Sequence, residues 1–240
     1  MLILALDSTA VSASVALCDG EHLLAEYTIE NGNTHSENLL PMVEELLNKF
    51  NLTPKDIDLF ACTAGPGSFT GVRIGVATIK GLAFHTSKPC IGVSTLASLA
   101  RNLVGFGADL EEGVIVSPVM NARRAQVYNA LFRIRGNEIE RLTPDRAIPI
   151  SELEGELSVY PSPIYLCGDG YDVTKNGFST LLVSETSSRL RAQSGYSTAV
   201  EALRLYESGI RTSDREILPI YLRPCQAERE RMEKEAASAH

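Results

Sequence analysis

A glycine-rich loop between residues 65 and 75 contains the residue types most suited to contacting a ligand. Four glycines and one proline fall where the apolar run 59–63 is followed by a helical pattern. Glycines at such a junction permit positive φ angles and close backbone approach, and the N–H groups at a helix start attract anions. Two interpretations stay open: a tight turn that packs closely, or a loop that contacts a ligand through Gly65, Gly67 and Ser68.

The other reactive residue types do not form a catalytic pattern. The serines at 68, 94 and 117 lack the flanking residues of a nucleophile elbow, and the paired acids at 44–45 and 111–112 are typical of solvated faces. Five cysteines are scattered without a Cys-x-x-Cys pair, which favours reduced, buried thiols over zinc or redox chemistry. No two of the four histidines are spaced to share a helix face: His22, His35, His85 and His240. We therefore expect neither a metal site nor a nucleophile.

Composition limits the classes of partner. The chain has 240 residues, 44% of them hydrophobic, so it can bury one large core or two smaller ones. Its formal charge of −8 makes nonspecific attraction to polyanionic phosphate weak or repulsive. Asp7 interrupts the apolar start after six residues, and no later apolar run approaches the length of a membrane span. We expect a soluble, cytoplasmic protein that would meet RNA only through a partner's basic surface.

The elements that would position the glycine loop begin with a β-meander. Residues 2–6, 11–17 and 22–29 resemble strands, with a polar turn at Asp7-Ser8-Thr9. Thr34 and Glu37 have the spacing of a capping box, and Ser94 is placed to cap a later helix. A meander followed by helices recurs beyond a hinge candidate at 105–113, which predicts two lobes. The remaining expected elements are a strand at 57–63, a helix to about 84, strands at 89–93, 114–120, 126–134, 138–142 and 164–167, a helix at 198–206 and an extended segment at 218–223.

Two helices carry faces that a partner could use. Apolar residues of the helix after Thr34 span an arc of roughly 160°, wider than a surface helix needs for its own core. Pro41 lies in this pattern, so the helix either kinks there or begins near Asn38. In the helix after the glycine loop, Gly71, Gly75 and Thr78 form a face without bulk, which would pack either on the chain's own sheet or on another molecule.

Six motifs in order carry a resemblance to a known family: Ile3–Thr9, His35–Pro41, Ala64–Gly75, Gly92–Leu96, Asn121–Arg123 and Pro219–Arg223. Together they resemble the bacterial TsaB family, formerly YeaZ, over most of residues 1–225. The resemblance implies an α/β chain with the actin-like ATPase fold (ASKHA, ribonuclease H-like), built as two lobes of mixed sheet with flanking helices. With the hinge candidate, we expect a first lobe at 1–105, joined by a C-terminal helix near 197–209, and a smaller second lobe at 106–196. The charged, alanine-rich residues 226–240 are expected to form a loose tail.

The same resemblance implies a role in making threonylcarbamoyladenosine, the modified base beside the anticodon of tRNAs that read codons starting with A. The related catalytic subunit, TsaD, carries a metal-binding His-x-x-x-His pair where this chain has Thr95 and Leu99. Neither side chain replaces an imidazole ligand. We therefore expect a noncatalytic subunit without intrinsic cofactor that binds TsaD, with the ATPase TsaE as a further partner. ATP or ADP would bind at the interface of the complex, and tRNA would be met only through the complex.

The expected contacts fall into two sets. Those for a partner are Leu39, Met42, Leu46, Gly71, Arg73, Gly75 and Thr78. Those for a nucleotide, on the analogy of the fold, are Asp7, Ser8, Thr9, Gly65, Gly67, Ser68 and Arg123. Asn121 departs from the family's usual aspartate, so a charge that would orient Arg123 is missing. The alternatives are an actin-like, ATP-dependent small-molecule kinase using Asp7-Ser8-Thr9 and Gly168-Asp169-Gly170, or a purely structural homodimer.

Overall fold

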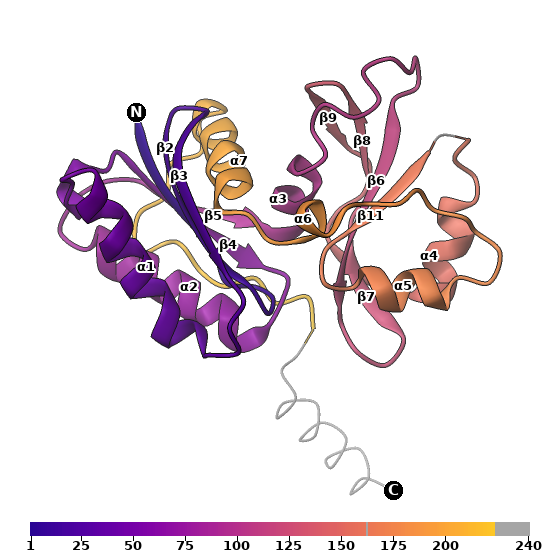
Figure 1. The fold of residues 1–240 in the computed structure, drawn as a ribbon, viewed down its shortest axis with the longest axis horizontal. Helices are drawn as coiled ribbons and strands as arrows, with labels where there is room; N and C mark the ends of the chain where they lie inside the picture. Colours follow the sequence, from indigo (N-terminus) through magenta and orange to yellow (C-terminus); the bar gives the residue numbers. More distant parts are fainter. Residues whose placement is uncertain (162, 224–240) are drawn as a thin grey trace, which may run out of the picture.

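Two mixed β-sheets with flanking helices make up the chain, as seen in a computed structural model that describes residues 1–161 and 163–223 (Figure 1). The first lobe contains the sheet nearest the N-terminus, and the second lobe contains the other sheet. Helices α3 (Thr95–Arg101) and α7 (Gly195–Glu207) lie between the two sheets. The tail that we expected at 226–240 lies outside the described residues.

The first sheet has the strand order β3-β2-β1-β4-β5. Its first three strands form the predicted antiparallel meander, while β1, β4 and β5 run parallel. Both faces of β1 are covered, which explains its continuous apolar sequence. This order confirms the expected lobe of mixed sheet. The strands are β1 (Leu2–Asp7), β2 (Ala13–Asp19), β3 (His22–Ile29), β4 (Leu59–Gly65) and β5 (Cys90–Ser94).

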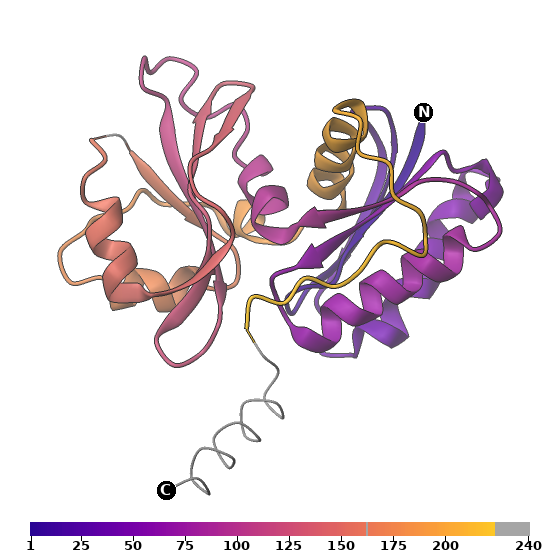
Figure 2. The same ribbon diagram turned by 180° about the vertical axis from the view of Figure 1, so that it is seen from behind.

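Helices α1 (His35–Lys49) and α2 (Phe69–Ala83) cover one face of the first sheet, and α7 covers the opposite face (Figure 2). The capping box is confirmed, because the Glu37 carboxylate accepts hydrogen bonds from the backbone and hydroxyl of Thr34. The helix therefore begins at His35 and contains Pro41, which settles the question of its start. A short 3-10 helix, Pro54–Asp56, leads from α1 to β4.

The second sheet has the order β10-β7-β6-β8-β9, with β11 beside β6. The single strand predicted at 126–134 is divided into β7 and β8, which pair with β6 in one continuous antiparallel register. That register places the break at 130–131 opposite Pro118, which has no N–H to donate. The strands are β6 (Val114–Asn121), β7 (Gln126–Asn129), β8 (Phe132–Arg135), β9 (Glu138–Arg141), β10 (Arg146–Pro149) and β11 (Ile164–Cys167).

Helices α4 (Ile150–Leu157), α5 (Tyr171–Gly177) and α6 (Ser188–Arg191) belong to the second lobe. Helix α3 joins the lobes, since its apolar side packs into the core of the second sheet while Arg101 forms an ion pair with Glu201 of α7. The division of the chain at residue 105 stays a prediction. No helix in the described part of the chain has the length and apolar character needed to cross a membrane.

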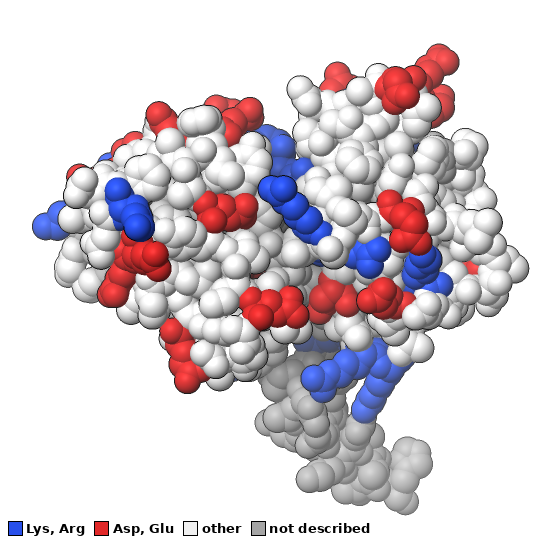
Figure 3. Space-filling view, in the orientation of Figure 1, with Lys and Arg blue, Asp and Glu red and all other residues white. Residues whose placement is uncertain are grey.

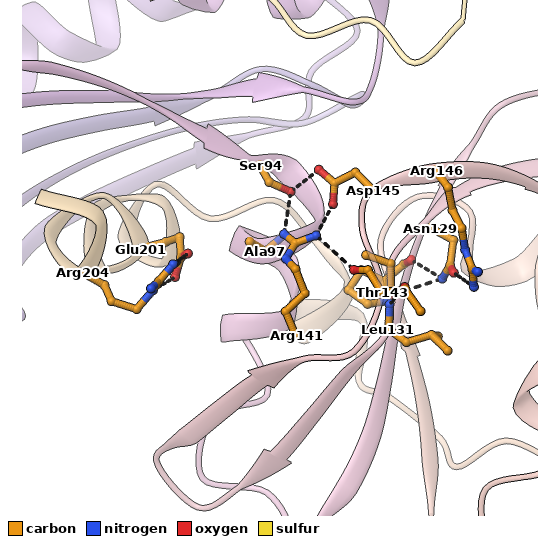
Figure 4. A network of polar contacts seen from close by, with 12 residues as sticks. Ser94, Ala97, Asn129, Leu131, Arg141, Thr143, Asp145, Arg146, Glu201 and Arg204 are labelled. Carbon is orange, nitrogen blue, oxygen red and sulfur yellow. Dashed lines mark hydrogen bonds and ion pairs between the residues drawn. The ribbon is translucent and has the colours of Figure 1, made fainter. Parts of the chain in front are cut away.

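A polar contact fixes the start of α3 against the second lobe (Figure 4). Asp145, in the loop after β9, accepts a hydrogen bond of 2.6 Å from the hydroxyl of Ser94. Arg141 at the end of β9 donates to both the Asp145 carboxylate and the Ser94 hydroxyl. Ser94 also caps α3, as predicted, by accepting from the backbone of Ala97 at 3.2 Å. The junction between the lobes is therefore held by hydrogen bonds between Ser94 and a charged pair of the second lobe, as well as by apolar packing.

Candidate functional site

A cleft of about 570 Å³ opens between the lobes and collects several of the residues expected to bind a nucleotide. Its walls come from the β1–β2 turn, the glycine loop, the turn between β6 and β7, and the C-terminal segment. Thr9, Gly67, Ser68 and Arg123 line it together, although the last of these is far from the others in sequence. The fold therefore brings the glycine loop and the Asn121–Arg123 motif to one place. Whether a nucleotide binds there stays a prediction.

The glycine loop owes its composition to close packing. A Cβ atom on Gly65 would lie 2.4 Å from the carbonyl oxygen of Ile220, and φ is +120° at this glycine. A Cβ atom on Gly67 would lie 2.6 Å from the carbonyl oxygen of Thr9, which accepts a 2.7 Å hydrogen bond from the backbone N–H of Ser68. Both glycines are required by neighbours within the chain. The interpretation as a closely packed turn is therefore sufficient to explain them.

The polar turn after β1 directs most of its side chains inward. The Asp7 carboxylate is fully buried and accepts hydrogen bonds from the backbone and hydroxyl of Thr9 at 2.8 and 2.7 Å. Burial raises the pKa of Asp7 to about 6, although the bonds from Thr9 lower it. The Ser8 hydroxyl donates to the carbonyl oxygen of Gly71 at 2.9 Å. Asp7 and Ser8 therefore stabilise the turn, and only Thr9 of this group lines the cleft.

The turn between β6 and β7 has an unusual backbone. Arg123, Arg124 and Ala125 have φ angles of 62°, 54° and 54°, a left-handed conformation that is uncommon away from glycine. The Asn121 side-chain oxygen accepts a 2.9 Å hydrogen bond from the backbone N–H of Arg123, and the Asp169 carboxylate accepts one from the backbone of Asn121 at 3.0 Å. The turn is thus held by an amide oxygen at Asn121, the position where the resemblance led us to expect a carboxylate. In the second glycine turn, Gly168-Asp169-Gly170, Asp169 is the residue that lines the cleft.

Thr95 and Leu99, which the resemblance in the sequence matches to a histidine pair, lie in the core. Thr95 and Leu99 are both buried, on α3, and in the described residues no group of three or more histidine, cysteine or acidic side chains is placed to hold a metal ion. The described cysteines are also buried and free: Cys18, Cys62, Cys90 and Cys167. Burial raises the pKa of the Cys90 thiol to about 11, so at neutral pH this thiol is protonated and unreactive.

The residues expected to bind a partner from α1 require correction. Leu39, Met42 and Leu46 have exposed fractions of 1%, 8% and 0%, because they pack into the core between α1 and the first sheet. The wide apolar arc is explained by that core, with Leu40 and Phe50 left at the surface, 46% and 38% exposed. A partner that docks on α1 would therefore contact Leu40 and the exposed Pro41.

The glycines expected at a partner contact on α2 also face inward. A Cβ atom on Gly71 would lie 2.0 Å from the carbonyl oxygen of Ser8, and one on Gly75 would lie 2.6 Å from the Ser8 hydroxyl. Of the two alternatives for this face, the structure places it on the chain's own sheet. A bulky substitution at Gly75 would disturb the folded chain itself, so it cannot serve as a clean test of partner binding.

On the outer face of α2 the sequence analysis named Arg73 and Thr78 but missed Ala77, Gly81 and Phe84, which helical spacing from Arg73 would have found. Arg73, Ala77, Gly81 and Phe84 follow one another at this spacing and are exposed. A Cβ atom on Gly81 would meet nothing within 4 Å. Thr78 is half-buried beside this row and donates to the carbonyl of its own helix. We define the outer α1–α2 face by Leu40, Pro41, Arg73, Ala77, Thr78, Gly81 and Phe84.

Comparison with known proteins gives a consistent result. A family model described as "TsaD: tRNA N6-adenosine threonylcarbamoyltransferase" matches residues 22–195. The chain is similar to the tRNA threonylcarbamoyladenosine biosynthesis protein TsaB of Bacillus subtilis, with 32% identity over 182 residues, which are 76% of this chain and 77% of the relative. The TsaB protein of Escherichia coli is 37% identical over 140 residues, 58% of each chain. The structure of YeaZ from Pseudomonas aeruginosa superposes with a TM-score of 0.76 at 25% identity, covering 92% of this chain and 99% of that one.

Proposed function

Because this chain belongs to the TsaB family of tRNA threonylcarbamoyladenosine biosynthesis proteins, which is homologous to but distinct from the catalytic TsaD, we propose that it binds and supports a TsaD subunit. TsaD would transfer the threonylcarbamoyl group to the adenosine beside the anticodon of tRNAs that read codons starting with A. The ATPase TsaE would join the same assembly in the cytoplasm. This chain would contribute a binding surface and no catalytic residue.

The observation that supports this proposal most strongly is the outer α1–α2 face. Its α2 side is formed by small or short side chains at Ala77, Thr78 and Gly81, and its α1 side presents Leu40. Phe84 at the end of α2 is 61% exposed, and its ring centroid lies 4.0 Å from that of His85, so it adds apolar area to this face. A surface of this kind lets the helices of a second molecule approach closely and bury apolar area.

Charges at the edge of the face would orient a homologous partner. Exposed Glu44 and Glu45 lie on α1, and Arg73 and Lys80 lie on α2. When two related molecules pair through such faces in antiparallel fashion, the acidic helix of each meets the basic helix of the other. The same complementarity favours a homodimer when TsaD is absent. On the face in Figure 3, acidic and basic side chains of the described residues are interspersed, apart from a basic group at the bottom of the view, so this face has no broad basic area for direct binding of tRNA.

A titration with TsaD from the same organism tests the proposal. The variant Gly81→Leu adds bulk to the outer α1–α2 face at a position where a Cβ atom meets nothing within 4 Å, so its Kd for TsaD should rise at least about tenfold. Gly155→Leu is the matched control, because Gly155 lies on α4 of the second lobe and a Cβ atom there also meets nothing within 4 Å. Equal affinity of Gly81→Leu and the wild type would refute docking through this face.

The kinase alternative is less well supported by the cleft. A nucleotide with its metal ion needs carboxylates and cationic side chains beside its phosphates. Asp7 is fully buried away from the cleft, and the charged side chains among the described residues that line it are Arg123, Asp169 and Arg223. None of them lies on the β1–β2 turn or the glycine loop, where the analogy with actin-like kinases would put the phosphates. We therefore propose that ATP or ADP binds where the two subunits meet. Calorimetry with ATP should detect binding to the complex with TsaD, whereas turnover by the isolated chain that is lost in Asp7→Asn would instead support a kinase.

A further inference from the structure

The Pro219–Arg223 motif lies in a C-terminal strap that the proposed function does not explain. We define this strap as Ile217–Arg223; it follows α7 and crosses the first lobe toward the cleft (Figure 2). Ile217 is buried in the core, where Gly92 leaves room for its side chain. The backbone N–H of Ile220 donates a 2.7 Å hydrogen bond to the carbonyl oxygen of Ala64. The strap is therefore attached to the first lobe beside the glycine loop.

An aromatic stack connects the strap to α2. The rings of Tyr221 and Phe69 are stacked with centroids 4.5 Å apart. The Arg73 guanidinium lies 3.9 Å from the Phe69 centroid, and its Nε donates a 2.7 Å hydrogen bond to the Tyr221 hydroxyl. Arg73 thus contacts both rings of the stack while it also belongs to the outer α1–α2 face.

The far end of the strap reaches the second lobe. An Nη1 atom of Arg223 donates a 2.9 Å hydrogen bond to the carbonyl oxygen of Ala122. Ala122 begins the left-handed turn that also carries Arg123, and both ends of this contact line the cleft. One short segment is therefore bonded to α2 at Tyr221 and, two residues later, to the opposite wall of the cleft at Arg223.

We propose that the strap is a latch that couples occupation of the outer α1–α2 face to the second lobe. An acidic group of a docked partner would form an ion pair with the Arg73 guanidinium and break the hydrogen bond from Arg73 to Tyr221. Release of Tyr221 loosens Arg223 from Ala122 and frees the β6–β7 turn. The identity of the partner rests on the proposed function, but the coupling itself depends only on contacts within this chain. By linkage, a change at the cleft alters affinity at the face by the same factor.

The burial of the strap makes this coupling physically reasonable. Beyond the buried Ile217, the side chains of Leu218, Ile220 and Tyr221 are 63%, 46% and 41% exposed, so little buried apolar area holds this part of the strap in place. Its attachment depends on a few hydrogen bonds and one ring stack. Segments with few buried contacts open at lower free energy than the core and are the elements that switches use.

Hydrogen exchange measured by mass spectrometry on the full chain tests the latch. The Ile220 amide reports on the strap, and the Gln126 amide, which bonds to the Arg123 carbonyl, reports on the turn. Arg73→Ala should speed exchange in both segments by about tenfold, the effect of losing one hydrogen bond from a charged donor. Tyr221→Phe keeps the ring stack and removes the hydroxyl, so it should raise exchange in the same two segments. Lys80→Ala is the control, since Lys80 is a cation on the same helix with a long 3.4 Å contact to the Arg215 carbonyl.

Two results would overturn the latch. The first is wild-type exchange at Ile220 in both Arg73→Ala and Tyr221→Phe, and the second is faster exchange in the strap with no change in the β6–β7 turn. In a further arm, TsaD is added to the wild-type chain. Binding with altered exchange in both segments supports the coupling, and binding with neither altered contradicts it. Absence of binding contradicts only the proposed function, because the variants still decide the latch.

Discussion

Two glycines on α2 should respond in opposite ways to the same substitution. Gly71→Ala places a Cβ atom 2.0 Å from the carbonyl oxygen of Ser8, whereas ordinary contacts begin at 3.4 Å, so the turn or the helix must move by about 1.4 Å (3.4 − 2.0). Gly81→Ala places its Cβ atom in open space. The pair therefore separates the effect of packing from the effect of helix propensity.

The magnitudes follow from three contributions. Overpacking costs about 1–3 kcal/mol, and displacement of the turn also weakens the 2.9 Å hydrogen bond from Ser8 to Gly71, worth about 1 kcal/mol. Alanine gains up to about 1 kcal/mol over glycine inside a helix. Gly71→Ala should therefore lower the free energy of unfolding by about 2 kcal/mol. Gly81→Ala should raise it by about 1 kcal/mol, which corresponds to a Tm increase of about 2–4 °C for a chain of this length.

Urea unfolding followed by circular dichroism gives both values on one scale. Two-state behaviour should be checked by comparing the m value of each variant with that of the wild type. A Gly71→Ala variant as stable as the wild type would show that the approach of α2 to the β1–β2 turn is not a tight one. A Gly81→Ala variant less stable than the wild type would show that the outer face of α2 is not free in the isolated chain.

Two further predictions concern buried charges. Because burial raises the pKa of Asp7 from 3.8 to about 6, the folded chain loses stability as the pH rises through this interval and the carboxyl ionises. The free energy of unfolding of Asp7→Asn should therefore equal that of the wild type near pH 4 and exceed it by about 3 kcal/mol at pH 8. A difference that is independent of pH would contradict this prediction. Glu201→Gln leaves the Arg101 guanidinium, 13% exposed, without its counter-charge, so urea unfolding should show a loss of about 3 kcal/mol, against almost none for the exposed Glu207→Gln.

Local signals accounted for most of the elements. The capping box at Thr34 and the cap at Ser94 gave the starts of α1 and α3, because caps depend on residues close in sequence. The sequence predicted a strand at 126–134 but did not predict that it divides into β7 and β8. The division depends on the partner strand β6, which contains Pro118. The candidate site was found in part: Thr9, Ser68 and Arg123 meet in the cleft, whereas the side chain of Asp7 turns inward.

The sequence by itself indicated the family, the type of most strands and helices, and the lack of histidine at Thr95 and Leu99, since these depend on residue identity and short-range spacing. It did not indicate β10, α4, α5 or α6. Only the tertiary structure decided which side of each helix is free. Gly71 meets Ser8, a residue 63 positions away, and helical periodicity cannot reveal such a neighbour. An apolar or bulk-free stripe has the same pattern whether its own sheet or another molecule covers it, because burial depends on what lies opposite.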